Sequence, residues 1–242
     1  MIGIIGAMDV EVNTLVSMME KEREVVVCGS VFHIGKLCGQ DVGIVVCGIG
    51  KVAAAACTQA MIDLFHADAI INTGIAGGLD DRLSVCDLVI ATDAIQHDFD
   101  VHYFGYAKGF IPGSKGDHSL PTRFVADRLL CERIEKAASL HIGKNKFIRG
   151  TVVSGDQFIC DDAVRAGLKK DYFAAATEME GASIAQVCTL NSVPFAIIRA
   201  ISDLAGDSAG VSYAEFETLA AERSAAIVQS VLSSATDEHI KL

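Results

Sequence analysis

Short apolar runs alternate along this chain with longer segments of helical periodicity. The apolar runs predict strands over residues 2–5, 25–28, 31–37, 41–47, 69–71, 88–91, 147–153 and 195–198. Many of these runs lack polar alternation, which is typical of strands that helices cover on both faces. Helices are predicted over residues 10–19, 52–65, 124–140, 182–189 and 213–232. Strands that alternate with helices predict an α/β sandwich with a parallel or mixed sheet.

Two connections add to this prediction. The spacer Gly39-Gln40-Asp41 is typical of a β-hairpin, so we expect antiparallel pairs within the sheet. The longest loop, residues 103–121, is rich in glycine and carries the aromatic side chains Tyr103, Phe104, Tyr106 and Phe110. A loop of this length in a compact domain is often functional. Its aromatic side chains favour a surface that excludes water, such as a subunit interface.

Composition indicates one domain, residues 1–242, in a reducing compartment. Apolar residues make up 51% of the 242 residues, which is enough for a large core. The formal net charge of −11 disfavours binding to nucleic acid or to an anionic membrane, because both attract Lys and Arg. The eight cysteines form no Cys-x-x-Cys pair. With no signal-peptide pattern and no apolar run of about 20 residues, we expect a cytoplasmic protein.

Acidic residues stand where three apolar runs end. Glu11 follows the first predicted strand, Glu178 and Glu180 follow the apolar residues 174–176, and Asp203 follows the last predicted strand. Carboxylates at such ends are costly to desolvate, so they usually have a partner or a chemical task. A sheet that brings the three ends together predicts acid–base chemistry on a small molecule.

Two glycine-rich segments also follow predicted strands. Residues 48–53 match part of the dinucleotide fingerprint G-x-G-x-x-A, but the next strand ends at Asn72 without an acid for a ribose. A P-loop is excluded because Val52, and not Ser or Thr, follows Lys51. Two interpretations of residues 48–53 therefore stay open: a structural turn between a strand and a helix, or a turn that lines a nucleoside pocket. A nicotinamide site is a weaker alternative. Residues 73–78 are interpreted as a second glycine turn, either a connector or a place where a ligand approaches the backbone.

The segment His97–His102 resembles a metal-binding cluster. In a strand, Asp98, Asp100 and His102 would share one face. A metal site needs three or four convergent ligands, and no second His or Cys cluster is present to complete one. We therefore expect no metal site.

Six sequence blocks, taken in order, resemble one known family. They are GIIGAM (3–8) with Glu11, GIGKV (48–52), NTGIAGG (72–78), VSGDQF (153–158), EME (178–180) and RAISD (199–203). The chain is similar in these blocks to the 5′-methylthioadenosine/S-adenosylhomocysteine nucleosidases of the nucleoside phosphorylase superfamily. The resemblance implies a three-layer α/β/α sandwich around a twisted mixed β-sheet, a homodimer, and no metal or organic cofactor. It also implies hydrolysis of 5′-substituted adenosines to adenine and the 5′-substituted ribose, in methionine salvage and purine nucleoside catabolism.

The resemblance implies catalytic roles for five residues. Glu11 matches the base that activates water, and Arg199 lies near that water. Glu180 matches the acid that holds the ribose hydroxyls and steadies positive charge on the sugar. Asp203, supported by Ser202, matches the general acid that protonates the purine.

The resemblance also implies substrate contacts. Phe158 matches the residue that stacks on adenine, the Ile159 backbone matches the reader of the adenine edge, and Met179 lies beside the ribose. The 5′ group meets an apolar wall of Met8, Ile49 and Val101, with Tyr213 closing this part of the pocket. Phe104 and Pro112 match residues that reach in from the partner subunit. The remaining predicted binding residues are Gly77 and Glu178.

General chemistry agrees with these roles, although structural alternatives exist for each acid. Breaking an N-glycosidic bond builds positive charge on the sugar and negative charge on the purine. One carboxylate counters the first charge and a protonated carboxyl removes the second. From the residues alone, however, Glu11 is equally interpreted as a solvated first-turn acid. Asp203 is equally interpreted as a helix N-cap, and Glu180 as a structural partner of Arg199.

Three positions depart from the family pattern, and rival functions remain. Ile75 replaces a Ser near the water site, Tyr213 replaces a frequent Phe, and Thr177 replaces an aliphatic residue.

A phosphorylase on the same fold would need a cation to bind phosphate, but the loop at residues 7–11 is acidic. A non-catalytic nucleoside sensor and an aminodeoxyfutalosine nucleosidase are two further candidate functions. Methylthioadenosine, S-adenosylhomocysteine, 5′-deoxyadenosine and aminodeoxyfutalosine share the adenine and the ribose, and all four stay open as substrates.

Overall fold

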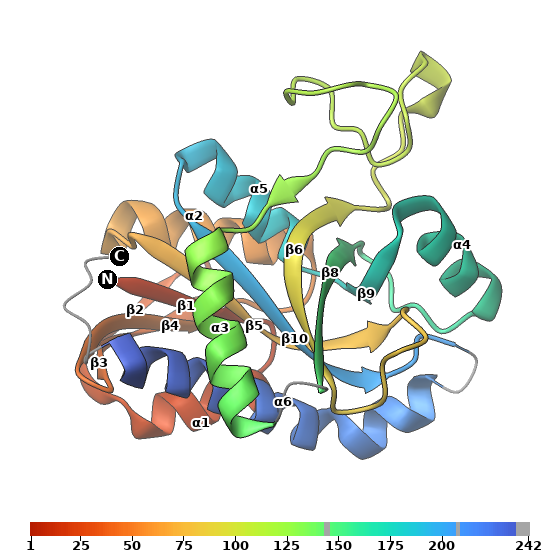
Figure 1. Ribbon diagram of the computed structural model, residues 1–242. Helices are drawn as coiled ribbons and strands as arrows, with labels where there is room; N and C mark the ends of the chain where they lie inside the picture. Colours follow the sequence, from red (N-terminus) through yellow and green to blue (C-terminus); the bar gives the residue numbers. More distant parts are fainter. Residues whose placement is uncertain (143–145, 207–208, 236–242) are drawn as a thin grey trace.

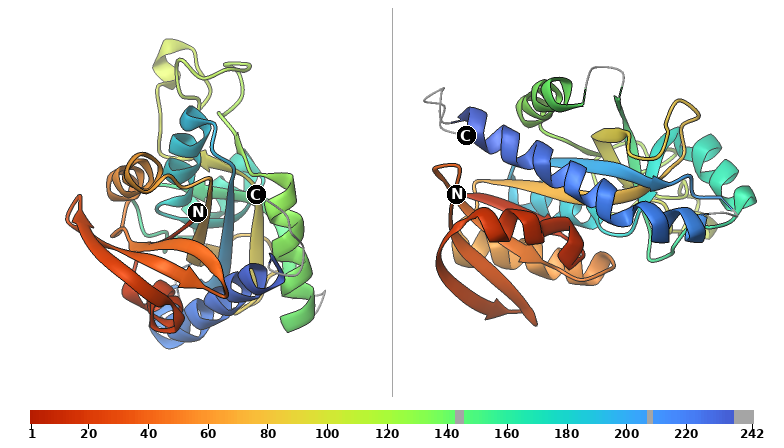
Figure 2. Two further views of the ribbon diagram at one scale, coloured as in Figure 1. Left: turned by 90° about the vertical axis from the view of Figure 1, so that its left-hand side faces the viewer. Right: turned by 90° about the horizontal axis from the view of Figure 1, so that it is seen from below.

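A single mixed sheet organises the protein, with helices on both of its faces (Figures 1 and 2). The computed structural model describes residues 1–142, 146–206 and 209–235. The helices are α1 (Asp9–Met18), α2 (Lys51–Phe65), α3 (Arg128–His141), α4 (Asp162–Tyr172), α5 (Gly181–Asn191) and α6 (Ala209–Ala235), with a 3₁₀ turn at His102–Phe104. The strands are β1 (Ile2–Gly6), β2 (Glu20–Val27), β3 (Ser30–Leu37), β4 (Gln40–Val46), β5 (Ala69–Gly78), β6 (Leu88–Gln96), β7 (Phe124–Val125), β8 (Phe147–Ser154), β9 (Ala174–Glu178) and β10 (Phe195–Asp203).

The sheet closes on itself around its longest buried strand, β5. Strand β5 pairs with β1 in its first half, with β9 near its end, and with β10 along most of its length. Strands β10, β6, β8 and β9 follow one another and return to β5. Parallel pairing of β1, β5 and β10 brings their carboxyl ends to one edge, where ligands bind in open α/β sheets.

The layers agree with the predicted α/β/α sandwich. Helices α1, α3 and α6 pack together against one face of the sheet, and α2 and α5 pack together against the other. Their apolar sides enclose one large core, in which Ile4, Ile71 and Ile198 are almost fully buried. None of the described helices is both long and apolar enough to cross a membrane.

The predicted hairpin is confirmed, and its turn shows why these residues form it. Strands β3 and β4 pair antiparallel from Phe32–Val45 to Leu37–Gln40. The two turn residues, Cys38 and Gly39, both have positive φ, at 51° and 76°. This backbone matches the type I′ turns that connect two-residue hairpins.

Several predicted boundaries are wrong. The expected glycine turn at residues 73–78 is the second half of β5, because β9 and β10 pair with its small residues. The expected helix at 124–140 begins with strand β7, and α3 starts only at Arg128, after the N-cap Asp127 accepts a hydrogen bond from Leu130 N at 2.9 Å. Helix α4 and strand β9 were not predicted from the sequence.

The segment 97–102 is not a strand, so its acidic and histidine side chains do not share one face. Strand β6 ends at Gln96 and the chain turns into the long loop. His102 pairs with Asp100 at 2.5 Å, whereas Asp98 pairs with Lys51. Within the described ranges, no three His, Cys, Asp or Glu side chains are grouped as metal ligands would be.

Candidate active site

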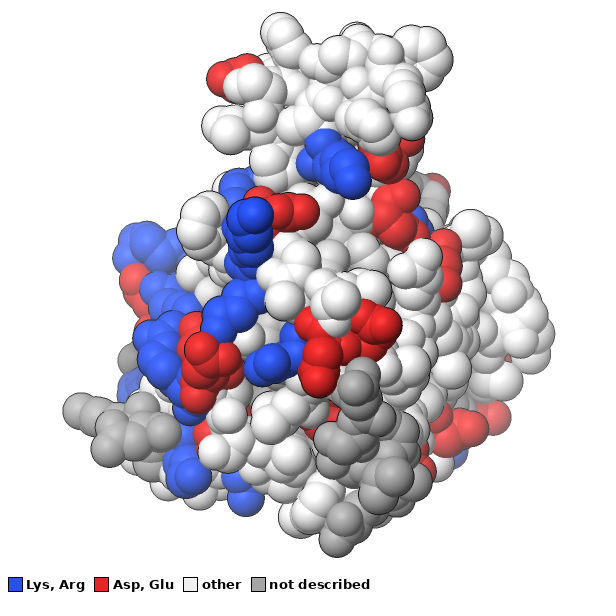
Figure 3. Space-filling view, turned by 90° about the vertical axis from the view of Figure 1, so that its right-hand side faces the viewer, with Lys and Arg blue, Asp and Glu red and all other residues white. Residues whose placement is uncertain are grey.

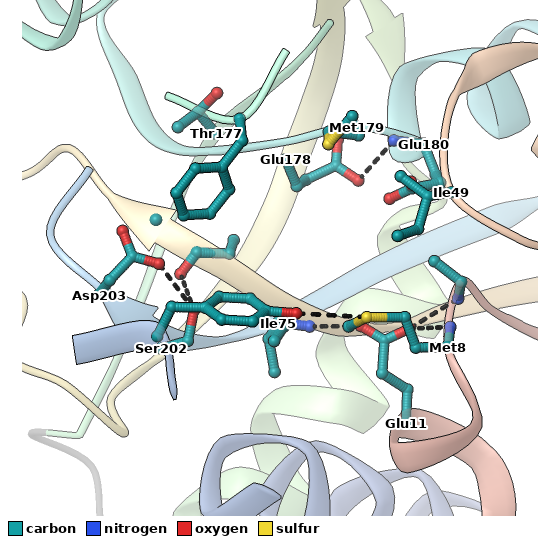
Figure 4. A pocket seen from close by; sticks show the side chains of 15 residues that line it. Met8, Glu11, Ile49, Ile75, Thr177, Glu178, Met179, Glu180, Ser202 and Asp203 are labelled. Carbon is teal, nitrogen blue, oxygen red and sulfur yellow. Dashed lines mark hydrogen bonds between the residues drawn. The ribbon is translucent and has the colours of Figure 1, made fainter. Parts of the chain in front are cut away.

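A cavity of about 500 Å³ lies where β1, β5, β9 and β10 end (Figure 4). It brings together side chains that are far apart in the sequence. The predicted residues that line it are Met8, Glu11, Ile49, Gly77, Phe158, Glu178, Met179, Glu180, Ser202, Asp203 and Tyr213. Ala7, Ile75, Ala76 and Thr177 complete the lining.

Glu11 is buried at the floor of the cavity, not solvated on the first turn of α1. Its Oε2 accepts hydrogen bonds from the backbone N–H groups of Ala7 and Met8, at 2.6 and 3.0 Å, and its Oε1 accepts one from Ile75 N at 3.0 Å. Burial raises the pKa of Glu11, opposed by the charge of Arg199 and by these three donors. A Cβ at Gly74 would overlap the Glu11 carboxylate where these three donors hold it, so glycine at this position permits the approach.

Arg199 is buried behind the cavity and forms an ion pair with Glu178, not with Glu180. Its Nη2 donates to Glu178 Oε2 at 2.6 Å and also to Asn72 Oδ1. The other guanidinium nitrogen, Nη1, donates to the carbonyls of Asn72 and Ile198. The structural pairing considered for Glu180 is therefore wrong, because the neighbouring carboxylate occupies the guanidinium.

Glu178 has donors on both carboxylate oxygens. Ser154 Oγ donates to Oε1, while Oε2 accepts from the backbone N–H groups of Glu180 and Gly181, at 3.1 and 2.7 Å, in addition to Arg199. These donors hold both carboxylate oxygens of Glu178 in place at the start of α5.

Glu180 stands at the N-cap position of α5 and faces the cavity. Its Oε1 accepts a hydrogen bond from Gly50 N at 2.7 Å. Burial, and then the negative charge of Glu178, raise the pKa of Glu180 to about 8, opposed by the Gly50 N–H and by Arg199. The turn at residues 48–50 therefore lines the cavity and positions a carboxyl group.

Asp203 is the last residue of β10 and does not cap a helix. Its Oδ2 accepts from Ser202 Oγ at 2.9 Å, and its Oδ1 accepts from Ala205 N at 2.7 Å. Burial raises the pKa of Asp203, opposed by these two donors. A Cβ at Gly77 would lie 3.0 Å from Asp203 Oδ1, which explains a small residue opposite this carboxyl group.

A cluster of charged side chains ties the turn at residues 48–51 to the loop that carries Phe158. Lys51 Nζ donates to Asp98 Oδ1 at 2.5 Å and to Gln96 Oε1 at 3.3 Å. Lys51 N donates to Asp156 Oδ1 at 2.8 Å, and Asp156 N donates to Asp98 Oδ2 at 2.9 Å. These contacts hold two walls of the cavity together.

Aromatic side chains lie at the mouth of the cavity. The rings of Phe158 and Tyr213 meet edge to face, with centroids 5.6 Å apart. The Tyr213 hydroxyl donates to Met8 Sδ at 3.3 Å. Phe158 is 48% exposed, which is unusual for a large apolar side chain and suits a surface for a planar ligand.

Five predicted site residues do not line the cavity of this single chain. Arg199 lies behind it, and the side chain of Ile159 is buried in a smaller core cluster with Leu79 and Tyr172. Val101, Phe104 and Pro112 lie on the long loop, which projects from the body of the protein (Figure 1). In that loop Phe110 is buried and stacks on Tyr106, whereas Tyr103 and Phe104 are 93% and 80% exposed.

Ile75 and Thr177 were named in the sequence analysis only as departures from the family pattern, and two further lining residues, Ala7 and Ala76, were not predicted at all. Neither side chain carries a reactive group, and Ala7 contributes its backbone N–H to Glu11. The sequence holds no chemical signal for these two positions. Only the small size of alanine, which lets strands and carboxylates pack close to the backbone, sets them apart.

The Arg199–Glu178 pair gives a stability prediction. Arg199→Met should lower the free energy of unfolding by about 3–5 kcal/mol, because it leaves Glu178 charged and buried. Urea unfolding measures this change, and the double variant Arg199→Met/Glu178→Gln should recover part of the loss. Arg128→Met, which removes an exposed ion pair with Glu132, is the control and should cost less than about 1 kcal/mol. A single-variant loss as small as that of the control would contradict a buried charge at Glu178.

Comparisons with known proteins agree with the geometry of the site. A family model described as the phosphorylase superfamily matches residues 1–233. A 5′-methylthioadenosine/S-adenosylhomocysteine nucleosidase of Geobacillus thermodenitrificans (strain NG80-2) is 44% identical over 232 residues, 95% of each chain. A nucleosidase of Shewanella sediminis (strain HAW-EB3) is 42% identical over 96% of this chain and 98% of its own.

Solved structures give the same result. The Neisseria meningitidis 5′-methylthioadenosine/S-adenosylhomocysteine nucleosidase, in complex with methylthio-immucillin-A, is 40% identical with a TM-score of 0.90, over 96% of this chain and 98% of that one. A futalosine hydrolase of Helicobacter pylori strain 26695 is 32% identical with a TM-score of 0.89, over 96% and 97% of the two chains. The chain therefore belongs to the phosphorylase superfamily and, within it, to the family of 5′-methylthioadenosine/S-adenosylhomocysteine nucleosidases.

Proposed function

We propose that the protein hydrolyses the N-glycosidic bond of 5′-substituted adenosines, releasing adenine and the 5′-substituted ribose. The observation that carries this proposal is the set of three acids in one cavity, Glu11, Glu180 and Asp203, each with different donors. The names of the relatives support the choice of nucleoside.

Asp203 is the proposed general acid. Departure of the purine requires a proton on its five-membered ring, and a carboxyl group delivers one only if it holds a proton near neutral pH. Burial favours the protonated form of Asp203. Ser202 Oγ and Ala205 N fix the two carboxyl oxygens, so the group is held in place before the substrate enters.

Glu180 is the proposed partner of the sugar. Its pKa lies above the ordinary glutamate value because it is buried beside the charged Glu178. Positive charge that develops on the ribose favours the ionised form of Glu180, so the carboxylate stabilises the transition state. Such an interaction grows as the bond breaks, which is the requirement for catalysis.

Glu11 is the proposed base for water. A raised pKa makes Glu11 a stronger base than an exposed glutamate, and it lies on the floor of the cavity, apart from Asp203 (Figure 4). Three backbone donors hold the carboxylate, and Ile75 borders it with an apolar side chain where the family often has Ser.

The substrate is proposed to lie across the cavity from Asp203 to Met8. Phe158 stacks on the purine, and the Ile159 backbone reads its edge. The ribose lies beside Met179 and Glu180, with Glu178 and Gly77 along the same wall. The 5′ group lies against Met8, Ile49 and Tyr213. This arrangement requires no metal or organic cofactor, because Asp203 supplies the proton to the purine and Glu11 accepts the proton from water.

Water is favoured over phosphate as the second substrate. None of the described residues that line the cavity is Lys or Arg. The nearest buried cation, Arg199, already donates to Glu178 and to Asn72. Phosphate binding needs charged donors that are free to contact it.

A second candidate substrate is aminodeoxyfutalosine, which shares the adenine and the ribose. The similarity to a futalosine hydrolase structure over 96% of this chain favours keeping this alternative. The Tyr213 hydroxyl also makes the 5′ end of the cavity more polar than a Phe would.

The proposed reaction is tested by adenine release from four substrates, with and without phosphate. These are methylthioadenosine, S-adenosylhomocysteine, 5′-deoxyadenosine and aminodeoxyfutalosine. We expect release without phosphate, with free 5′-substituted ribose as the second product. Release that requires phosphate and yields a ribose 1-phosphate would contradict hydrolysis. The ratio of kcat/KM values among the four identifies the preferred 5′ group.

Replacing Asp203 tests its role as the acid. Asp203→Asn should lower kcat by about 10²- to 10⁴-fold, because an amide donates no proton to the leaving purine. The matched control is Asp171→Asn, an exposed position at the end of α4, which should leave kcat within about twofold. Near-normal turnover of Asp203→Asn would remove it from the mechanism.

A homodimer is proposed in which Phe104 and Pro112 of each subunit complete the 5′ end of the neighbouring site, near Val101. The loop carries the exposed Tyr103 and Phe104 and bears few charges (Figure 3). Its aromatic side chains would be buried in such an interface. The free thiols and the composition support a reducing, cytoplasmic location.

Sedimentation of the wild type and of Phe104→Asp tests the dimer. We expect a dimeric wild type, and a variant that dissociates more readily and has a raised KM, because a buried charge at Phe104 is costly. Lys108→Asp, an exposed change on the same loop, is the control. A fully active wild-type monomer would contradict the shared site.

A further inference from the structure

Two neighbouring backbone N–H groups at the start of α2 donate to two different carboxylates. The N–H of Gly50 donates to Glu180 Oε1 at 2.7 Å, and Glu180 lines the cavity. The next N–H, that of Lys51, donates to Asp156 Oδ1 at 2.8 Å, outside the lining. Gly50 is the N-cap of α2, and no side chain of its own fixes its positive φ of 99°. The direction of the Gly50 N–H therefore depends on the contact that the neighbouring Lys51 N–H makes with Asp156.

Asp98 completes a ring of hydrogen bonds around this contact. Its Oδ1 accepts from Lys51 Nζ at 2.5 Å, and its Oδ2 accepts from Asp156 N at 2.9 Å. The Lys51 and Asp98 side chains are only 17% and 18% exposed, so solvent screens this ion pair less than one on an open surface. With one carboxylate, Asp98 thus holds both segments whose contact orients the turn at residues 48–51.

The Gly50 N–H is one of several groups that act on the charge of Glu180. The charged or titratable side chains that face Glu180 belong to Glu178, Arg199, Glu11 and Cys47. Burial raises the pKa of the Cys47 thiol, which keeps it neutral. Burial and the charge of Glu178 raise the pKa of Glu180. The Gly50 N–H lowers it, and Arg199 lowers it less. A weaker hydrogen bond from Gly50 would therefore raise the pKa of Glu180.

We propose that Asp98 is a positioning residue that holds the Gly50 N–H against the carboxyl group of Glu180. This inference rests on the proposed nucleosidase function, in which the ionised Glu180 stabilises positive charge on the sugar. Asp98 acts through the backbone of the turn at residues 48–51, with Asp156 as the link. The ring of Lys51, Asp98 and Asp156 thereby has a role in the reaction, although none of the three lines the cavity.

Asp98→Asn tests this role, because the amide offers one acceptor oxygen where the carboxylate offers two. The quantity measured is the midpoint of the Glu180 titration, followed by NMR of protein labelled at the glutamate carboxyl carbons. The signal of Glu180 is assigned by its absence in Glu180→Gln. We expect the midpoint to rise by about half a pH unit, the size of a weakened hydrogen bond. Loss of the Asp98 charge alone would lower the midpoint, so the sign of the shift separates position from charge.

The kinetics of the same variant measure the consequence for the reaction. At pH values below the midpoint, a smaller fraction of Glu180 is ionised in Asp98→Asn than in the wild type. The kcat/KM for adenine release from methylthioadenosine should therefore fall about threefold, which corresponds to half a pH unit.

Asp156 provides a second test at an exposed side chain. Asp156→Ala removes the acceptor for the Lys51 N–H, whereas Asp156→Asn keeps an amide oxygen at the same place. The Glu180 midpoint should rise in the alanine variant and should not rise in the asparagine variant. This pair of variants decides the question if Asp98→Asn does not fold.

The matched control is Asp41→Asn, which breaks an exposed Lys–Asp contact of the same length, 2.5 Å to Lys36, in the β3–β4 hairpin. Its Glu180 midpoint and its kcat/KM should equal those of the wild type. A midpoint that stays in place or falls in folded Asp98→Asn or in Asp156→Ala would overturn the inference, as would an unchanged kcat/KM of Asp98→Asn. If the wild type releases no adenine from methylthioadenosine, the proposed function itself fails. The titration does not depend on turnover, so the two failures are distinguished.

Discussion

The structure depends on one buried cation that is shared by three buried carboxylates. Burial alone would lower the pKa of Arg199, but the charges of Glu178, Glu11 and Glu180 raise it overall. Only Glu178 contacts the guanidinium directly, at 2.6 Å. One positive charge does not neutralise three negative ones in a medium of low dielectric. Burial raises the pKa of Glu11, and burial together with the charge of Glu178 raises the pKa of Glu180. In the proposed reaction, the developing sugar cation supplies the missing positive charge.

The closed part of the sheet makes this arrangement of charges possible. Strand β5 pairs with β1, β9 and β10. Strands β9 and β10 end at Glu178 and Asp203, and β1 leads into α1, whose first turn carries Glu11. Small residues of β5 allow the carboxyl groups to approach, since Gly74 faces Glu11 and Gly77 faces Asp203. The backbone of β5 thus fixes the distance between the proposed base and the proposed acid, and the side chains above it determine which substrate fits.

Much of the fold and many of the residues that line the cavity were predictable from the sequence. The buried strands have continuous apolar runs, so local pattern was sufficient to predict them. Local pattern also singled out the acids at the ends of those runs, but their catalytic roles came from the family resemblance. The second half of β5 was misinterpreted as a turn because its glycines are typical of turns, and only pairing with β9 and β10 makes it a strand. The structural alternative that pairs Glu180 with Arg199 is also wrong, because Glu178 takes that place. Glu178 and Glu180 are two residues apart, and only the start of α5 decides which of them meets the guanidinium.

The central claim is that adenine lies against Asp203 while the sugar lies between Glu180 and Glu11. A crystal structure with a non-hydrolysable adenine nucleoside analogue tests it directly. We expect a nitrogen of the purine's five-membered ring at hydrogen-bonding distance from Asp203, about 2.6–3.2 Å. The ribose hydroxyls should contact Glu180, with a water molecule between the sugar and Glu11. An analogue bound with its purine away from Asp203 and its sugar away from Glu11 would contradict the account.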